Sequence, residues 1–395
     1  MAVWNPLPVC RRDLDLGMTL FNGQAFLWTC EKRADFVEFC GSILDSLYAL
    51  RYRLGDESVQ DLSARVEFCV ISEKSDTAKS DVDHYARLVN YFNLETNLKA
   101  LVQTWCIRDA HMALVAPKYS GIRVLTIDII ESLISFLSSS NNNIKRISQM
   151  LWRLCQHFPQ NKFSCEAFPL SRDFYRFPDL IQLSTLSECT LRKLGFGFRA
   201  PYIVSAIQQV GNNGGGVWLS SLSTMKRGQA CVALQSLSGC GPKVANCICM
   251  CSLRLFDSVP VDTHCLQLMR RYYVTKESPL LRCRSLTARR HTMLGDIMRS
   301  IFGDHVSWAF MLLFTAELAD FRARSRTQSR FFANASSAGR PPKQPPARLM
   351  NFFAGQRGRR HHRRESTTRD RGDESDLRSE EVKAEAPTRK PAEDV

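Results

Sequence analysis

One stretch of the sequence, residues 237–264, constrains the fold more than any other. It reads LSGCGPKVANCICMCSLRLFDSVPVDTH and opens with Gly239 and Gly241, which predict a tight turn with bared backbone amides, a geometry that can cradle a phosphate. Apolar residues then recur at helical spacing, so we expect a helix that begins near Lys243. An extended run follows and ends at Asp262, which stands where an N-cap would precede a second helix.

This arrangement resembles the helix-hairpin-helix motif of the DNA glycosylase superfamily, with its Gly/Pro-rich loop and aspartate. Within that superfamily, LSGCGPKVANCIC followed by VPVDTH is most similar to the 8-oxoguanine DNA glycosylases. A hairpin alone also occurs in DNA-binding proteins without catalytic activity. The pair of Lys243 and Asp262 therefore carries more of the resemblance than the two glycines.

The chain as a whole is predicted to be an α+β protein. Short β-like runs such as Gln24–Thr29 and Arg65–Ile71 alternate with polar connectors, and helical patterning follows around His84–Trp105. We expect a mixed antiparallel-sheet domain, an all-α helix-hairpin-helix glycosylase domain and a disordered basic tail, over residues 1–119, 120–319 and 320–395.

The net charge of +14 and the pI of about 9.2 favour a polyanionic partner, although basicity alone does not separate nucleic acid from an acidic membrane. No apolar run is long enough to span a bilayer, and the first residues show no signal-peptide core. We therefore expect a soluble intracellular protein without a membrane partner.

The 15 cysteines are scattered and are expected to be reduced thiols. Cys247, Cys249 and Cys251 alternate along the predicted helix, so successive thiols fall on different faces and one metal cannot bind all three. Some glycosylase relatives carry a four-cysteine iron–sulfur loop, and no four clustered cysteines follow Asp262. We expect no iron–sulfur cluster and no other cofactor.

Near the N-terminus, NGQAFLW resembles the family segment Ser-Gly-Gln-Ser-Phe-Arg-Trp. The resemblance implies that the Gly23 carbonyl accepts a hydrogen bond from N7–H of an oxidised purine. Normal guanine has an acceptor at N7, so this one carbonyl discriminates between the two bases. The alternative is an ordinary turn glycine in a hairpin.

Two further motifs point to the DNA around the damaged base. SSNNNIKRI matches the family's Ser-Ser-Asn-Asn-Asn-Ile-x-Arg-Ile, which implies that Asn141 and Arg146 contact the cytosine opposite the lesion. LGFGFRAPY resembles Leu-Gly-Leu-Gly-Tyr-Arg-Ala-Arg-Tyr, which implies that Phe198 fills the base stack as a wedge and that Arg199 joins Arg146 at the cytosine. Without the resemblance, the second motif is a glycine-rich turn with a core aromatic residue.

A late apolar segment, SWAFMLLFTAEL, lines up with Gly-Trp-Ala-Gln-Ala-Val-Leu-Phe-Ser-Ala-Asp-Leu of the family. This register implies that Phe314 and Cys247 sandwich the everted base. It also exposes the largest departure, because Phe310 replaces the glutamine that binds the base edge in the family. A milder departure is Glu317 in place of an aspartate, and we expect it still to orient His264, itself a pocket or phosphate-binding residue.

The chemistry implied by the resemblance is base excision. Lys243, as a neutral amine, would attack C1′ of the sugar and form a Schiff base, and Asp262 would stabilise the positive charge that develops there. The backbone amides around Gly239, Gly241 and Val244 would hold a phosphate. No metal is required, but relatives hold a monovalent cation on backbone carbonyls, which here belong to Gln235, Leu237 and Cys240.

The basic tail contains one hydrophobic island, PARLMNFF. The spacing of Leu349, Phe352 and Phe353 resembles the motif by which repair proteins dock on the sliding clamp, although Pro346 replaces its leading glutamine. A chance hydrophobic island is the alternative. The basic run that follows is typical of a nuclear import signal or a non-specific DNA arm, so we expect a nuclear protein.

We therefore predict a monomeric base-excision repair enzyme, a DNA glycosylase with AP lyase activity. Its predicted substrate is double-stranded DNA that contains an oxidised purine, 8-oxoguanine opposite cytosine. The main alternative is a non-enzymatic helix-hairpin-helix protein that binds damaged DNA and is recruited to the sliding clamp. Excision of adenine opposite the lesion is disfavoured by the absent cysteine cluster and by two arginines suited to cytosine.

Overall fold

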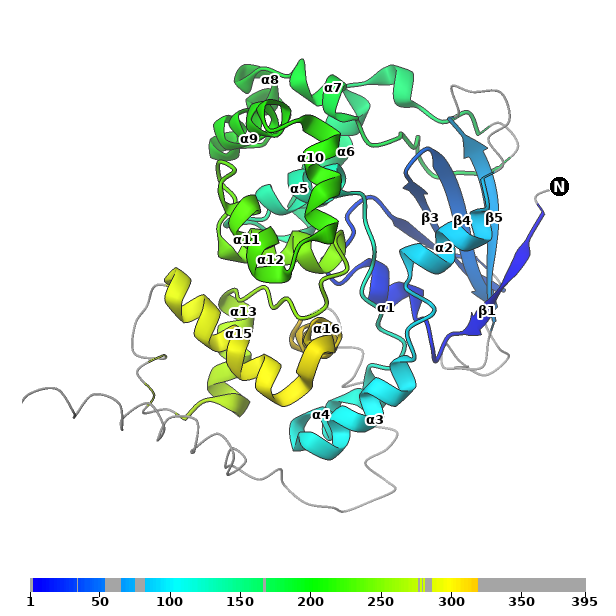
Figure 1. The fold of residues 1–395 in the computed structure, drawn as a ribbon. Coiled ribbons are helices and arrows are strands. Elements are labelled where there is room, and N and C mark those ends of the chain that lie inside the picture. Colours follow the sequence, from blue (N-terminus) through cyan, green and yellow to red (C-terminus); the bar gives the residue numbers. More distant parts are fainter. Residues whose placement is uncertain are drawn as a thin grey trace, which may run out of the picture. The chain divides into compact units, whose positions relative to one another are not determined.

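The computed structural model describes residues 3–33, 35–53, 65–74, 82–165, 168–275, 278, 280 and 286–318. Its N-terminal part contains an antiparallel sheet of five strands in the order β1-β5-β4-β3-β2 (Figure 1). The strands are β1 (Asn5–Cys10), β2 (Thr29–Lys32), β3 (Phe36–Ile43), β4 (Ser46–Arg53) and β5 (Arg65–Glu73). The antiparallel sheet expected from the sequence is confirmed.

The central strand β4 is buried on both faces, since Leu47, Tyr48, Ala49 and Leu50 are all inaccessible to solvent. One face is covered in part by α2 (His84–Tyr91), where Tyr91 accepts a hydrogen bond of 3.0 Å from the Trp28 indole. Trp28 can lie flat against β3 because Gly41 has no side chain, and a Cβ there would approach the indole to 2.4 Å. This packing anchors the segment that carries Gly23.

Most of the other regular elements in the described chain are helices. After α1 (Leu16–Leu20) and α2 come α3 (Leu98–Arg108), α4 (Ala110–Val115), α5 (Ile129–Leu137), α6 (Ile144–Gln156), α7 (Leu180–Ser184), α8 (Glu188–Lys193), α9 (Ala200–Asn212), α10 (Gly215–Ser221), α11 (Arg227–Gln235), α12 (Pro242–Cys251), α13 (Thr263–Leu268), a π-helical turn (Met269–Tyr273), α15 (Ala288–Phe302) and α16 (Val306–Glu317).

The predicted hairpin is formed by α11 and α12, with the turn at Gly239 and Gly241 between them. Pro242 occupies the first turn of α12, where its missing N–H costs no helical hydrogen bond. Asp262 is the N-cap of α13, and its Oδ1 accepts a hydrogen bond of 2.9 Å from the Cys265 N–H. The helix, turn and cap predicted from the sequence are confirmed.

One predicted strand is wrong, because Gln24–Thr29 is irregular until β2 begins at Thr29. The cause is the buried Gln24 amide, which donates to the Arg123 carbonyl at 2.9 Å and accepts from the Leu125 N–H at 3.0 Å. These bonds take the place of a ladder with a neighbouring strand. No helix among the described residues is long and apolar enough to cross a membrane.

The two predicted structured domains share buried contacts. The Trp105 indole on α3 donates to the Phe302 carbonyl at the end of α15 at 3.0 Å, which joins the two. Within the second domain, the Ile127 N–H donates to the Cys251 carbonyl at 2.6 Å. The end of α12 is therefore tied directly to the segment that leads into α5.

Candidate active site at the hairpin

Lys243 lies in the first turn of α12, and its side chain reaches the C-terminal end of α5. Its Nζ donates to the Ser139 hydroxyl at 2.8 Å and lies 5.6 Å from the centroid of the Phe136 ring. The side chain is half-buried. The amine is thus held against the protein at a defined position, as a nucleophile requires.

Asp262 is also half-buried, and one of its oxygens caps α13. The loop before it is held by α15, since the Val261 N–H donates to Nε2 of His291 at 3.0 Å. Burial, together with the charges of Arg299 and Arg227, lowers the pKa of His291 to about 4. The imidazole is therefore a neutral acceptor near pH 7 and supports the backbone next to Asp262.

Cys247 links the two predicted catalytic residues. The pKa of its thiol is raised to about 11, mainly by burial; the positive charge of Lys243 opposes this rise and the Asp262 carboxylate adds to it. Both charged groups therefore lie within electrostatic reach of one thiol. That Lys243 and Asp262 act together on one sugar stays a prediction.

The three alternating cysteines of α12 face different surroundings. The Cys249 thiol lies 3.6 Å from the Cys231 thiol on α11, while the Cys251 thiol lies 4.0 Å from Oε1 of Gln24. All three are buried, which agrees with the expectation of core or pocket thiols on different faces. Within the described ranges, no group of three or more His, Cys, Asp or Glu side chains could hold a metal ion.

The predicted base pocket contains a wall of aromatic rings. Phe310 is buried and stacks on Phe314, and His264 meets the Phe314 ring edge-on with centroids 5.8 Å apart. Glu317 forms an ion pair of 2.6 Å with Arg271 of the π-helical turn, a partner that the sequence did not suggest. Orientation of His264 by Glu317 stays a prediction.

Gly23 has a backbone conformation that favours glycine, with φ of +91°. A Cβ at this position would also lie 3.3 Å from Cδ1 of Ile144 on α6. Its two neighbours are pinned, since the Asn22 amide donates to the Thr315 hydroxyl on α16 at 3.2 Å and Gln24 binds backbone groups. The direction of the Gly23 carbonyl is therefore set by buried contacts, as a discriminating acceptor requires.

Residues 139–143 form what we call the opposite-base loop, between α5 and α6. Asn141 is exposed in a left-handed conformation with φ of +48°, and Arg146 is exposed in the first turn of α6. Arg199 differs from expectation because only 2% of its surface is exposed. Its guanidinium donates to the Ser140 carbonyl and, at 2.9 Å, to the Asn141 carbonyl.

Arg199 therefore stabilises the opposite-base loop from the buried side, through hydrogen bonds to its carbonyls. Burial lowers the pKa of its guanidinium, and the positive charge of Arg146 lowers it further. To contact cytosine, the Arg199 guanidinium would have to share its N–H groups between the base and the loop carbonyls, or release those carbonyls. That contact stays a prediction.

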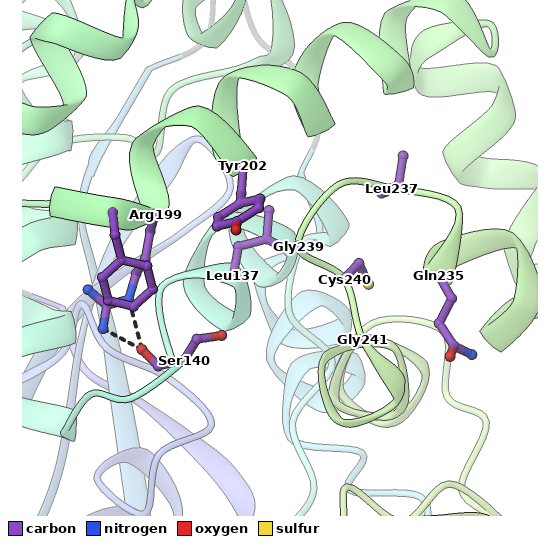
Figure 2. A pocket seen from close by; sticks show the side chains of 10 residues that line it. Leu137, Ser140, Arg199, Tyr202, Gln235, Leu237, Gly239, Cys240 and Gly241 are labelled. Atoms are coloured by element: carbon purple, nitrogen blue, oxygen red, sulfur yellow. Dashed lines mark hydrogen bonds between the residues drawn. The ribbon is translucent and has the colours of Figure 1, made fainter. Parts of the chain in front are cut away.

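Phe198 is 51% exposed, which is unusual for a large aromatic side chain and suits a wedge. It lines a cavity of about 420 Å³ together with the hairpin turn. Figure 2 shows this cavity, in which the Tyr202 ring lies over the turn and Arg199 is joined to Ser140. Its lining residues are Leu137, Ser140, Phe198, Arg199, Tyr202, Gln235, Leu237, Gly239, Cys240 and Gly241.

The hairpin turn has the geometry expected for a phosphate site. Gly239 has φ of +77°, and a Cβ there would approach Cβ of Tyr202 to 2.9 Å, so only glycine fits. Gly241 is the exposed N-cap of α12, and the N–H groups of the first turn, including that of Val244, have no partner within the helix. These amides lie at the positive end of the helix dipole.

The residues proposed for a monovalent cation share this turn. Gln235, Leu237 and Cys240 line the same cavity, and the Leu237 carbonyl already accepts the Cys240 N–H at 3.0 Å. A carbonyl has a second lone pair, so this bond leaves room for an ion. Carbonyl oxygens on one turn are suitable ligands for a monovalent cation. The binding of such an ion stays an expectation.

Comparison with known proteins assigns the family. The family model described as "8-oxoguanine DNA glycosylase, N-terminal domain" matches residues 6–133. The N-glycosylase/DNA lyase OGG1 of Arabidopsis thaliana is 35% identical over 317 residues, which cover 80% of each chain. The chain belongs to the 8-oxoguanine DNA glycosylase family. The N-glycosylase/DNA lyase of Saccharomyces cerevisiae is 28% identical over 79% of this chain and 85% of its own.

Solved structures support the family fold. The Clostridium acetobutylicum 8-oxoguanine glycosylase/lyase, solved with double-stranded DNA that contains cytosine opposite 8-oxoG, has a TM-score of 0.62 at 21% identity and covers 80% of this chain and 93% of its own. The 3-methyladenine DNA glycosylase of Archaeoglobus fulgidus has a TM-score of 0.55 at 15% identity, and covers 80% of this chain and 98% of its own. Proteins named for different bases share this fold, so the fold alone does not decide the substrate.

For this family member, the sequence motifs do not reveal some of the contacts around the candidate site. Ser139 and Tyr202 both lie inside the quoted motifs, yet neither was assigned a role. The contact between Ser139 and Lys243 joins residues that are 104 positions apart, and no local pattern reports it. No sequence motif indicates the ion pair between Arg271 and Glu317. The predicted clamp motif at Leu349, Phe352 and Phe353 lies outside the described residues.

Proposed function

We propose that this chain everts an oxidised purine, 8-oxoguanine opposite cytosine, from double-stranded DNA and excises it through a Schiff base on Lys243. As a family member it is a DNA glycosylase with DNA lyase activity. The observation that supports the assignment of the nucleophile is the half-buried Lys243 amine, which donates to the Ser139 hydroxyl at 2.8 Å. A protein that only binds DNA has no need of an amine held in this way at the start of the second hairpin helix.

The reaction divides between these two side chains. The Lys243 nitrogen forms a bond to C1′, and the bond between C1′ and the base breaks, so that its electron pair leaves with the base. The nitrogen loses a proton to the departing base, and the bond between C1′ and O4′ then breaks, so that O4′ takes up a proton from solvent and a protonated Schiff base forms. β-Elimination removes a proton from C2′ and breaks the bond between C3′ and its oxygen, and the phosphate leaves with that electron pair. The Asp262 carboxylate stabilises the positive charge at C1′ while the base departs.

Several contacts support an oxidised purine as the substrate. The Gly23 carbonyl is held between buried side chains, so it can accept N7–H of an oxidised purine and is mismatched with the N7 acceptor of guanine. The exposed Asn141 and Arg146 offer donors that suit the acceptors of a cytosine. Phe310 offers no hydrogen bond to the base edge, so discrimination rests on Gly23 and on stacking.

Borohydride trapping tests the proposal. Incubation of the protein with a duplex that contains 8-oxoguanine opposite cytosine should give a covalent adduct, and Lys243→Gln should give none. The same duplex with undamaged guanine is the control. An adduct that persists in Lys243→Gln would overturn the assignment of the nucleophile, and a wild-type protein that binds the duplex without an adduct would favour the non-enzymatic alternative. A panel of lesions and opposite bases then ranks the substrates.

We further propose that the protein works in the nucleus as a monomer and docks on the sliding clamp through Leu349, Phe352 and Phe353. The support is the sequence alone, since an aliphatic residue three positions before two aromatic residues lies in a strongly basic segment. Replacing Phe352 and Phe353 with Ala should abolish clamp binding by the full chain in calorimetry while excision of a free oligonucleotide stays unchanged. Equal clamp binding by both proteins would refute the docking site.

A further inference from the structure

Ser139 connects the predicted nucleophile to the opposite-base loop. Its hydroxyl donates its single proton to the Phe136 carbonyl at 2.7 Å. The oxygen therefore presents only lone pairs to Lys243, whose Nζ donates to it at 2.8 Å. A hydroxyl with its proton committed elsewhere is a directional acceptor, so it holds the amine in one place.

The next two residues of the same loop are tied to the wedge. Arg199 donates to the carbonyls of Ser140 and Asn141, and its guanidinium lies 4.3 Å from the centroid of the Phe198 ring. The link between Ser140 and Arg199 is visible in Figure 2. Three consecutive loop residues therefore make these contacts. Ser139 contacts Lys243, and Ser140 and Asn141 contact Arg199, which lies against the exposed Phe198 ring.

A movement of the opposite-base loop would therefore displace both the Lys243 amine and the Arg199 side chain that contacts Phe198. The loop carries the exposed Asn141, which is predicted to meet the base opposite the lesion. If that base fits, the loop keeps the geometry in which Ser139 holds Lys243; if it does not fit, a displacement of the loop also displaces the amine. Errors of about 1 Å in the placement of a reacting group can cost about a hundredfold in rate.

We propose that Ser139 is a positioning residue that couples recognition of the opposite base to the placement of the Lys243 amine. The inference rests on the proposed role of Lys243 as the nucleophile. Its consequence is that selectivity for the opposite base arises in the attack step as well as in binding. Ser139 itself does not contact the reacting atoms in this scheme.

The chain offers a matched control in Ser138. Its hydroxyl donates to the Ile134 carbonyl at 2.7 Å, the same kind of backbone contact that Ser139 makes, but its side chain is fully buried outside the loop. Ser138→Ala thus removes an equivalent hydrogen bond to the backbone. Ser139→Thr keeps the hydroxyl, whereas Ser139→Ala removes it.

The experiment measures single-turnover rates of the borohydride-trapped adduct at saturating protein, with cytosine or adenine opposite 8-oxoguanine. Ser139→Ala should lower the rate opposite cytosine about tenfold, the upper range expected for one lost hydrogen bond, and should reduce the cytosine-to-adenine rate ratio. Binding of a duplex with a stable abasic analogue should stay unchanged. Ser139→Thr should restore both rate and ratio, and Ser138→Ala should resemble the wild type.

Two results would overturn the coupling. One is a wild-type rate and ratio in Ser139→Ala, and the other is an equal loss in Ser138→Ala, which would indicate a general effect on the end of α5. Failure of the proposed function has a different signature, because the wild-type protein itself would then form no adduct.

Discussion

Phe310 stacks on Phe314 one turn later in α16, with ring centroids 5.6 Å apart and ring planes inclined by 28°. The pair presents an aromatic wall where the family resemblance implies a glutamine. Phenylalanine neither donates nor accepts hydrogen bonds, so N1–H and N2–H of a guanine-type base gain nothing from it. We therefore expect residue 310 to influence the substrate preference of this family member.

Replacing Phe310 with Gln should raise excision of 8-oxoguanine relative to ring-opened purines. An unpaired buried polar group costs about 1–3 kcal/mol, so a new amide partner should raise the 8-oxoguanine rate roughly tenfold. Single-turnover excision of the two lesions measures the ratio. Phe310→Leu, which removes the ring without adding a polar group, is the control and should not raise it. Unchanged or lower 8-oxoguanine excision in Phe310→Gln would count against this pocket.

Replacing Asp262 with Asn should separate the catalytic role of this residue from its structural role. Asn caps helices as well as Asp does, so the free energy of unfolding should stay within about 0.5 kcal/mol. The loss of the negative charge beside C1′ should lower the excision rate by roughly a hundredfold or more. Denaturant unfolding and single-turnover excision measure the two effects. A full excision rate in Asp262→Asn would show that the carboxylate only caps α13.

The buried His291 should make stability fall in acid. Its pKa in the folded protein is about 4, lowered from 6.5 by burial, so the unfolded state binds the proton more readily. The stabilisation is complete above about pH 6.5 and is lost as the pH falls towards 4, by an amount on the order of 3 kcal/mol. Urea unfolding at a series of pH values measures it. His291→Gln keeps an acceptor for the Val261 N–H without titrating, so its stability should vary less over this range.

Replacing Phe198 with Ala should affect excision without destabilising the fold. The ring is half exposed, so unfolding should change by no more than about 0.5 kcal/mol. Loss of the wedge removes the group that fills the stack, and excision from a fully paired duplex should fall about tenfold or more. Val217→Ala, which alters an exposed residue of α10, is the control. The loss of excision rate in Phe198→Ala should be smaller when the lesion is mispaired, because extruding the damaged base then costs less free energy. An equal loss on the paired and the mispaired duplex would argue against a wedge.

The sequence by itself determined the local pieces of this protein. Gly239 and Gly241 predict the hairpin turn, Asp262 predicts a cap, and the spacing of apolar residues predicts α12. Each depends on backbone preferences and helical periodicity within a few residues, which the order of residues expresses directly.

Only the tertiary structure decided how these pieces meet. It placed Lys243 on Ser139, turned Arg199 towards the loop carbonyls and gave Glu317 the partner Arg271. It also kept Gln24–Trp28 out of the sheet, because the buried Gln24 amide found partners about 100 residues away. Such bonds follow from the packing of distant segments and the need to satisfy buried polar groups, and no local pattern in the chain encodes them.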